Sequence, residues 1–237
     1  MELLSKFSVK NKNIYLNNIK PCDILIVGWD GCLANVEGIY EQTIEDILNE
    51  VLYIFGKNAV KVSDLKYTMI FRKKDVKSLA VTLYHMYGQG CDVRLFVDVF
   101  VEKFTELFED RIKTRNISLD KSIVRLMNRA YKSGKKVYVF TTEPNMAKNI
   151  KQILFKNIVS FNGVWSNDKS LRASNLIIHE LEDVFSICSP QKVCIIDDSK
   201  MLKDCEEYGY NVVGVRSRFS SFDVCWLDEA NIIKSVF

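Results

Sequence analysis

A short apolar stretch near the N-terminus constrains the fold more than any other part of the sequence. Residues 23–27 read Asp-Ile-Leu-Ile-Val, and residues 28–33 continue as Gly-Trp-Asp-Gly-Cys-Leu. An apolar run bounded by charge and by glycine predicts a buried strand, which here ends in an acidic turn. In α/β proteins, turns at the carboxyl ends of parallel strands are where ligands bind. The stretch therefore predicts a core strand with a candidate binding turn at its end.

Further apolar runs follow later in the chain. They span residues 136–140, 158–161, 193–196 and 211–215, and helical patterns separate them. This alternation predicts an α/β fold with a doubly wound, mostly parallel, Rossmann-like sheet. The tail, residues 228–237, reads as a last helix. Two short apolar segments before residue 21 predict a small hairpin, for which a surface flap is favoured over an interaction arm.

Residues 38–116 contain no strand pattern. A helical stripe over residues 39–55 ends at Gly56, and a second helical segment, residues 75–87, stops at Gly88. Phenylalanines on a third segment recur at spacings of three and four, which is typical of a helix that faces a core. The predicted organisation is an N-terminal extension, a core in two pieces and an inserted all-helical domain: residues 1–21, residues 22–37 with 117–237, and residues 38–116.

Composition excludes several classes of protein. The formal net charge of +3 is too small to indicate a nucleic-acid-binding face. The seven cysteines include no Cys-x-x-Cys pair, and with only two histidines a structural zinc site is not expected. No apolar run approaches the roughly 20 residues of a membrane helix, and the N-terminus lacks the apolar core of a signal peptide. We therefore expect a cytoplasmic protein with free thiols and no membrane partner.

Polar residues stand where three of the predicted strands end. Asp30 follows the first, Thr141 follows the second, and Asp197 with Asp198 follows the strand at residues 193–196. Such strand ends converge on one crevice, where carboxylates and a hydroxyl suit Mg²⁺ beside a phosphate. Lys169 is a candidate counter-charge for that phosphate. Taken singly these residues have plainer readings, since Asp-Gly is common in turns and Asp-Asp-Ser before a helix is common as an N-cap.

The order and spacing of these groups resemble the four motifs of the haloacid dehalogenase (HAD) superfamily. The first motif of that family runs apolar strand, Asp, any residue, Asp, Gly, Thr, Leu, and residues 23–33 match it without a gap. An all-helical insertion directly after the first strand resembles the cap of subclass I members such as β-phosphoglucomutase and phosphoglycolate phosphatase. The resemblance implies the HAD core with a helical cap, and phosphate-ester chemistry with Mg²⁺.

The family's functional roles can be carried onto matching positions. The resemblance implies that Asp30 acts as general acid and base and lends its carbonyl to the metal. Thr141 and Lys169 would complete the catalytic set, and Asp197 and Asp198 would hold Mg²⁺ together with Asp30. The phosphate would be bound by a larger group of loop residues, namely Gly31, Cys32, Thr141, Thr142 and Lys169.

One departure decides most of the functional question, because Gly28 stands where the family keeps its nucleophilic aspartate. Glycine can neither attack phosphorus nor ligate a metal, so Mg²⁺ binding should also be weakened. Bulky Trp29 either fills the space of the missing carboxylate or is an ordinary core residue. The only other carboxylate on the strand, Asp23, lies at its opposite end.

Three hypotheses follow. The first is a degenerate, catalytically impaired phosphatase-fold protein with a binding, regulatory or structural role. The second is an active Mg²⁺-dependent phosphatase or phosphomutase that uses a non-standard nucleophile or direct attack by water activated by Asp30. The third is a structural subunit of a larger assembly. The partners expected are a small phosphorylated ligand and a protein, but not nucleic acid.

Overall fold

The computed structural model describes most of the chain in two compact units. One unit comprises Met1–Asn35 with Ile117–Phe237, and the other is Val36–Asn116. The described residues are 9–61, 76–114, 117–141, 146–166, 182–183, 186, 189–216 and 224–234.

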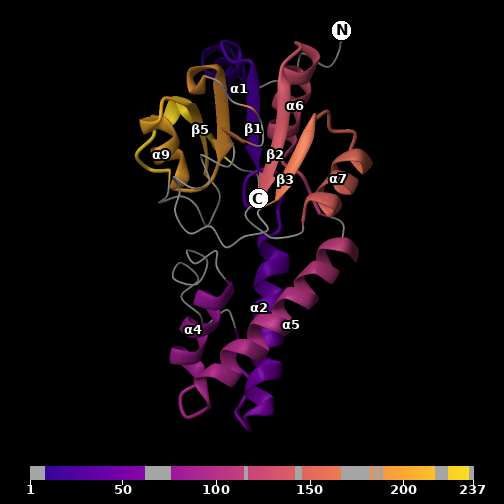
Figure 1. The fold of residues 1–237 in the computed structure, drawn as a ribbon, viewed down its shortest axis with the longest axis vertical. Coiled ribbons are helices and arrows are strands. Elements are labelled where there is room, and N and C mark those ends of the chain that lie inside the picture. Colours follow the sequence, from indigo (N-terminus) through magenta and orange to yellow (C-terminus); the bar gives the residue numbers. More distant parts are fainter. Residues whose placement is uncertain are drawn as a thin grey trace. The chain divides into compact units, whose positions relative to one another are not determined.

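In the described part of the first unit, six parallel strands form one sheet in the order β3-β2-β1-β4-β5-β6 (Figure 1). The first strand is the predicted one, and its residues 25–27 are fully buried between neighbours on both sides. The doubly wound α/β prediction is confirmed. The strands are β1 (Ile24–Gly28), β2 (Lys136–Thr141), β3 (Gly163–Ser166), β4 (Val193–Asp197), β5 (Asn211–Arg216) and β6 (Ile232–Lys234).

Helices cover this sheet in the positions that the sequence predicts. Helix α6 (Lys121–Lys132) packs on β2, α7 (Ala147–Lys156) on β3, and α9 (Met201–Glu207) on β4 and β5. Asp120 caps α6 by accepting hydrogen bonds from the backbone N–H groups of Ser122 and Ile123, at 2.7 and 3.1 Å. Short 3-10 turns precede two strands: η4 (Pro190–Lys192) and η5 (Glu229–Asn231).

The strand expected at residues 158–161 is displaced along the chain. These residues belong to the turn after α7, where Ile158 has a left-handed φ of 56° and is exposed. The strand begins only at Gly163, after the backbone N–H of Asn162 has bonded to the Val137 carbonyl at 2.6 Å. The prediction is wrong because the backbone N–H groups of Ile158 and Val159 bond back to carbonyls of α7 and so end the helix, although the segment is apolar.

The hairpin predicted before residue 21 is also wrong. Residues 9–19 are helical instead, as α1 (Val9–Ile14) and the π-helical turn η2 (Tyr15–Ile19). Ile14, Tyr15 and Ile19 are buried, and η2 packs against β4 and β5. The Tyr15 hydroxyl lies 2.8 Å from the Ser133 hydroxyl, and the Arg129 guanidinium lies 4.1 Å from the centre of the tyrosine ring. This segment belongs to the core because its apolar residues lie on one helical face.

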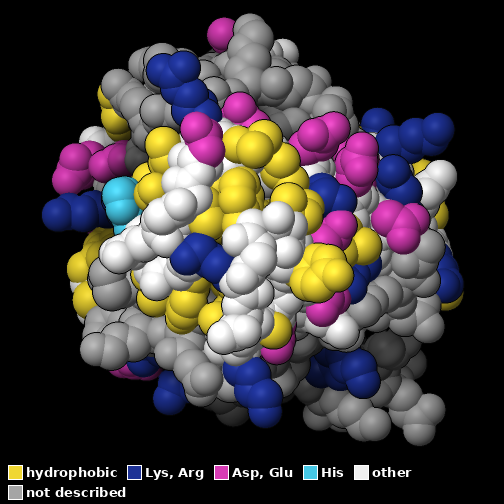
Figure 2. Space-filling view, turned by 90° about the horizontal axis from the view of Figure 1, so that it is seen from below, with side chains coloured by type: hydrophobic (Ala, Val, Ile, Leu, Met, Phe, Trp, Pro, Cys, Tyr) yellow, Lys and Arg dark blue, Asp and Glu magenta, His cyan; other side chains and the backbone are white. Residues whose placement is uncertain are grey.

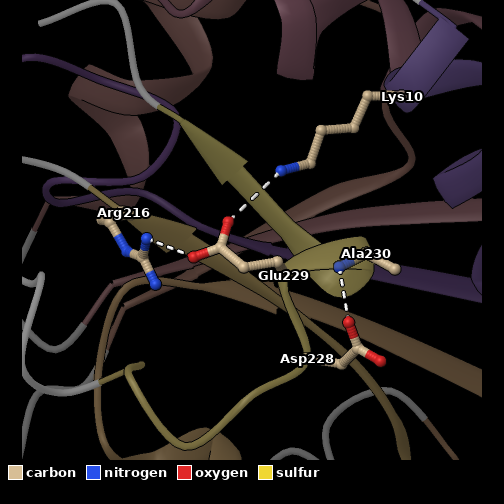
Figure 3. A network of polar contacts seen from close by, with 5 residues as sticks. All are labelled: Lys10, Arg216, Asp228, Glu229 and Ala230. Carbon is tan, nitrogen blue, oxygen red and sulfur yellow. Dashed lines mark hydrogen bonds and ion pairs between the residues drawn. The ribbon is translucent and has the colours of Figure 1, made fainter.

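The prediction of a last helix over residues 228–237 is wrong for the part of this segment that the structure describes. The described residues form η5 and then β6, which extends the sheet beside β5. Asp228 caps η5 through the Ala230 N–H at 2.8 Å, and Glu229 accepts from Arg216 at 2.5 Å with Lys10 at 3.8 Å (Figure 3). The hydrogen bond from Arg216 lowers the pKa of Glu229. The β-branched, buried pair Ile232 and Ile233 favours the strand.

In the described residues of the second unit, all the regular secondary structure is helical. The helices are α2 (Glu37–Ile54), α4 (Val76–Tyr87) and α5 (Val93–Thr114), and α5 packs on both of the others. The phenylalanine stripe of α5 is its core face, as predicted. Phe96, Phe100 and Phe104 are at most 1% exposed, and successive rings from Phe100 to Phe108 stack at 5.8 and 5.5 Å.

One end of this helical unit carries exposed apolar side chains. The rings of Phe55 and Phe96, 6.1 Å apart, join the end of α2 to the start of α5. Around that junction Figure 2 shows hydrophobic side chains gathered among Lys, Arg, Asp and Glu. The exposed apolar residues at the ends of α2 and α4 and at the start of α5 are Tyr53, Ile54, Met86, Val93 and Leu95.

Among the described helices, none combines the length and apolar composition needed to cross a membrane.

Three of the four buried thiols described in the first unit have raised pKa values. Burial raises the pKa of Cys22 from about 9 to about 11, and it raises the pKa of Cys194 and Cys205 as well. Cys22 is fully buried and donates to the Asn18 carbonyl at 3.0 Å. These thiols are therefore held in the protonated form.

If the N-terminal segment is part of the core, Ile19→Ala should destabilise the fold. Deleting a buried isoleucine side chain typically costs about 2–5 kcal/mol, and Ile19 is 0% exposed. The matched control is Asn17→Ala on the exposed side of the same turn, which should stay within about 0.5 kcal/mol. Urea denaturation measures both. Equal effects of the two variants would contradict the assignment.

Stability should fall at alkaline pH. The folded state holds the Cys22 proton more tightly than the unfolded state, so this contribution is complete below about pH 9 and is lost as the pH rises through about 11. Free energies of unfolding measured across this range should decline, and Cys22→Ala should flatten the decline. An unchanged slope in that variant would show that the thiol does not contribute.

Candidate functional site

The three central strands bring the candidate residues to one edge of the sheet. Gly28 is paired with Phe140 of β2, and Val27 with Ile196 of β4. Thr141 and Asp197 each follow one of those partners and end their strands. Because the strands are parallel and in this register, their carboxyl ends lie side by side around Gly28.

A tight turn follows β1. The N–H groups of Leu33 and Ala34 donate to the carbonyls of Gly28 and Trp29, at 3.1 and 2.9 Å. The Trp29 N–H donates to the Phe140 carbonyl at 2.8 Å, which ties the turn to β2. Gly31 has a φ of 67°, a left-handed conformation that favours glycine. The turn therefore holds Asp30 next to the end of β2.

Asp30 and Thr141 are joined directly. The Thr141 hydroxyl donates to Asp30 Oδ2 at 2.6 Å, and Thr141 is 1% exposed. A hydrogen bond to a carboxylate is roughly twice as strong as one between neutral groups. Two residues that the sequence places 111 positions apart are thus held in contact.

The space beside Gly28 is taken by Asp197. A Cβ built on Gly28 would lie 2.2 Å from Asp197 Oδ1 and 3.0 Å from Cγ, too close for any side chain unless Asp197 moved. Asp197 is 5% exposed, and its Oδ2 accepts a hydrogen bond from the Ser199 hydroxyl at 2.5 Å. The carboxylate of β4 therefore lies where a side chain of β1 would begin.

Asp198 and Cys32 are buried at the same edge. Asp198 is 6% exposed, whereas Cys32 is completely buried. The Cys32 thiol donates to the Ile196 carbonyl at 3.5 Å, so it faces the backbone of β4. Trp29 is 1% exposed, and its indole N–H has no hydrogen-bond partner in the described part of the chain.

The carboxylates at this edge of the sheet are candidate ligands for a metal ion. Within the described residues, no three His, Cys, Asp or Glu side chains are grouped so that they could hold one ion. Mg²⁺ commonly uses only one or two carboxylates, with phosphate oxygens and water as its other ligands. Asp197 and Asp198 are consecutive and both buried, and their carboxylates have the chemistry for that role without a third protein ligand.

Two predicted residues, Thr142 and Lys169, lie outside the described residues. The hydrogen bond from Ser199 to Asp197 is not predicted from the sequence, where Asp-Asp-Ser indicates either a metal motif or an N-cap. The N-cap of α9 is Lys200, which makes no side-chain cap, so the N-cap reading is wrong. A hydroxyl two residues after an aspartate is the pattern that points to the Asp197–Ser199 bond.

Comparison by sequence finds nothing: no protein-family model matches the chain, and no curated protein matches it. Comparison by structure finds close likeness. CbbY from Rhodobacter sphaeroides, in complex with xylulose-1,5-bisphosphate, superposes with a TM-score of 0.68 at 15% identity, over 90% of this chain and 94% of CbbY. This chain has a HAD-like fold.

Two further structures agree. A HAD hydrolase of family IA, variant 3, from Entamoeba histolytica gives a TM-score of 0.66 at 11% identity, over 90% of this chain and 93% of that one. A HAD-superfamily hydrolase of subfamily IA, variant 1, from Geobacter sulfurreducens gives a TM-score of 0.61 at 12% identity. The match covers 92% of this chain and 95% of that one. This likeness shows a phosphatase-type fold. The chemistry of this chain depends on its own residues at the end of the sheet.

Replacing Thr141 by valine keeps the side-chain shape and removes the donor to Asp30. A hydrogen bond to a charged group contributes about 1.5–3 kcal/mol, so Thr141→Val should lower the free energy of unfolding by about that amount. Thr105→Val, on an exposed face of α5, is the matched control and should cost about 0.5 kcal/mol or less. Chemical denaturation compares them, and equal losses would argue against the Asp30–Thr141 bond.

Proposed function

We propose that this protein is a degenerate member of the HAD superfamily that binds a small phosphorylated ligand without forming a phosphoaspartate. The ligand would bind at the edge of the sheet around Gly28, and the helical unit would serve as the cap. Asp30, Thr141, Asp197 and Asp198 are the described residues to which we assign binding. We assign Gly31, Cys32, Thr142 and Lys169 to the surrounding loops.

The observation that carries this proposal is the geometry at Gly28. Covalent phosphoryl transfer in this superfamily needs a carboxylate on that residue, and glycine has no side chain to attack phosphorus. Asp197 Oδ1 lies 2.2 Å from the position of the missing Cβ, so no side chain could be accommodated there without moving Asp197. The site therefore supports binding better than turnover.

Charge makes the binding dependent on a cation. Asp197 and Asp198 are both more than nine-tenths buried, and a bound cation would offset part of the cost of burying their charges. These two residues would hold Mg²⁺, with Asp30 nearby. Bound Mg²⁺ would neutralise the carboxylates and accept oxygens of the phosphate. The Thr141 hydroxyl, now bonded to Asp30, would be available as a donor to a phosphate oxygen once the ligand binds.

The test measures turnover and binding separately. With Mg²⁺, the protein should hydrolyse 4-nitrophenyl phosphate no faster than its Asp30→Asn variant does. Calorimetry with inorganic phosphate should detect binding only when Mg²⁺ is present. Asp198→Asn should weaken that binding by at least about 10-fold, because even residues that only support a metal ligand typically contribute 10- to 100-fold to metal affinity.

Asp23→Asn is the matched control, because Asp23 precedes β1 at the opposite edge of the sheet and is exposed. It should leave phosphate binding unchanged. Robust hydrolysis that is lost in Asp30→Asn would instead favour an active hydrolase. Absence of phosphate binding under all conditions would leave only a scaffold role.

A further inference from the structure

The exposed apolar side chains at one end of the helical unit form a surface that the proposed function does not use. We call this surface the apolar end, and we infer that a second copy of the chain binds to it about a twofold axis. The inference does not depend on the proposed function. The apolar end consists of Tyr53 and Ile54 of α2, Met86 of α4, and Val93 and Leu95 of α5.

The exposure of these side chains is high for large apolar residues. Tyr53 is 82% exposed, and Ile54 and Leu95 are 55% and 52% exposed. Single exposed apolar residues are common on soluble proteins, whereas a gathered group with a polar rim is typical of a binding surface. Figure 2 shows hydrophobic side chains gathered in this way among Lys, Arg, Asp and Glu. The apolar end therefore has the composition of an interface, with an apolar centre and a charged rim.

The apolar end is the end of the helical unit opposite to its two connections with the rest of the chain. Helix α2 begins at Glu37 and α5 ends at Thr114, each next to a boundary of the unit. The rings of Tyr40 and Phe108, 5.4 Å apart, place the start of α2 beside the last turns of α5. The 18 residues of α2, at 1.5 Å per residue, separate its two ends by roughly 27 Å. A second copy at the apolar end would therefore contact this unit far from both connections.

The start of α5 is held in place before any partner binds. The backbone N–H of Leu95 donates to Asp92 Oδ1 at 2.8 Å, and that of Phe96 donates to the Asp92 carbonyl at 2.9 Å. The Phe96 side chain is completely buried, so it anchors this turn in the core. Lys57 Nζ donates to the Gln89 carbonyl at 2.6 Å, which ties the chain after α2 to the loop before α5. A surface that is ordered in advance loses little conformational entropy on association.

Two charged residues of α5 favour a second copy as the partner. Arg94 and Asp98 are exposed and lie one helical turn apart, on the face that carries Leu95. Neither side chain forms a hydrogen bond or an ion pair with any residue that the structure describes. The helix dipole disfavours a cation such as Arg94 in a first turn, and Arg before Asp is the less favourable order for a pair within one helix. These charges therefore contribute little to the stability of their own helix.

Twofold symmetry gives each of these charges an opposite partner. In such an interface, residue i of one copy contacts residue j of the other, and the reverse contact forms as well. If two α5 helices cross antiparallel at the level of Phe96, Arg94 of each copy is opposed to Asp98 of the other, because both residues are two positions from Phe96. Leu95 of both copies then lies between the two charge pairs. The surface is thus complementary to itself, in charge and in apolar content.

Sedimentation velocity of the full chain tests the interface. The unsubstituted chain should shift from monomer toward dimer as its concentration rises to about 100 µM, because interfaces of modest area are weak. Leu95→Asp should remain monomeric over this range, because it places a charge at the apolar centre. The matched control is Ile158→Asp in the first unit, at a residue that is 85% exposed, and it should dimerise like the unsubstituted chain. Circular dichroism should show both variants folded, since neither side chain is buried.

Charge reversal tests the pairing of Arg94 with Asp98. Arg94→Asp and Asp98→Arg each place like charges across the interface, so each variant alone should dimerise at least about 10-fold more weakly. An equimolar mixture of the two variants restores both opposite-charge pairs and should form dimers again, which a change within one chain could not produce. A chain that is monomeric at every concentration overturns the inference. Undiminished dimerisation of Leu95→Asp, or no dimer in the mixture, also overturns it.

Discussion

The parallel pairing of β1 with β2 on one side and β4 on the other is the constraint on which the site depends. Residues 25–27 are fully buried, and burial of such apolar side chains is what holds a central strand in register. That register brings the turn after Gly28, the hydroxyl of Thr141 and the carboxylate of Asp197 to one edge. A shift of one residue would turn each of these side chains to the opposite face.

The same pairing buries carboxylates at the ends of the strands, which costs free energy. Asp197 and Asp198 are largely buried, and the described contacts of Asp197 include one hydroxyl donor, from Ser199. Asp30 shares the hydroxyl of Thr141. Hydrogen bonds from neutral hydroxyls only partly offset the cost of burying charge. Under the proposed function, a bound cation would neutralise these carboxylates and would allow an anionic ligand to bind at this edge.

Much of the fold could be predicted from the sequence, and the exceptions have physical causes. The helical stripes of α2, α5 and α6 are long and periodic, and a fully buried strand such as β1 is a continuous apolar run. Segments of three to six residues carry no such period. The helical residues 9–19 and the strand Ile232–Lys234 owe their conformation to what they pack against, so local pattern could not distinguish helix from strand there.

In the candidate site, the positions of the residues could be predicted from the sequence, but the direction of one side chain could not. The strand-end positions of Asp30, Thr141 and Asp197 follow from the order of strands, which the sequence indicates. The direction in which Asp197 points does not, because it depends on empty space over a glycine of another strand. The absence of a side chain at residue 28 is visible in the sequence, whereas the position of Asp197 Oδ1 beside that residue required coordinates.

The contact between the two ends of the described chain has a consequence for how the protein is made. The Asn18 side chain donates to that of Asn231 at 3.2 Å, across 213 positions of sequence, and α1 packs against η5. Closing so long a loop costs entropy before any contact repays it. During synthesis on the ribosome, the N-terminal helical turns emerge first but cannot complete their packing until η5 and β6 have been translated. Strands β1, β2 and β3 precede them in the chain and can pair earlier, so the β6 edge of the sheet becomes protected after the β3 edge.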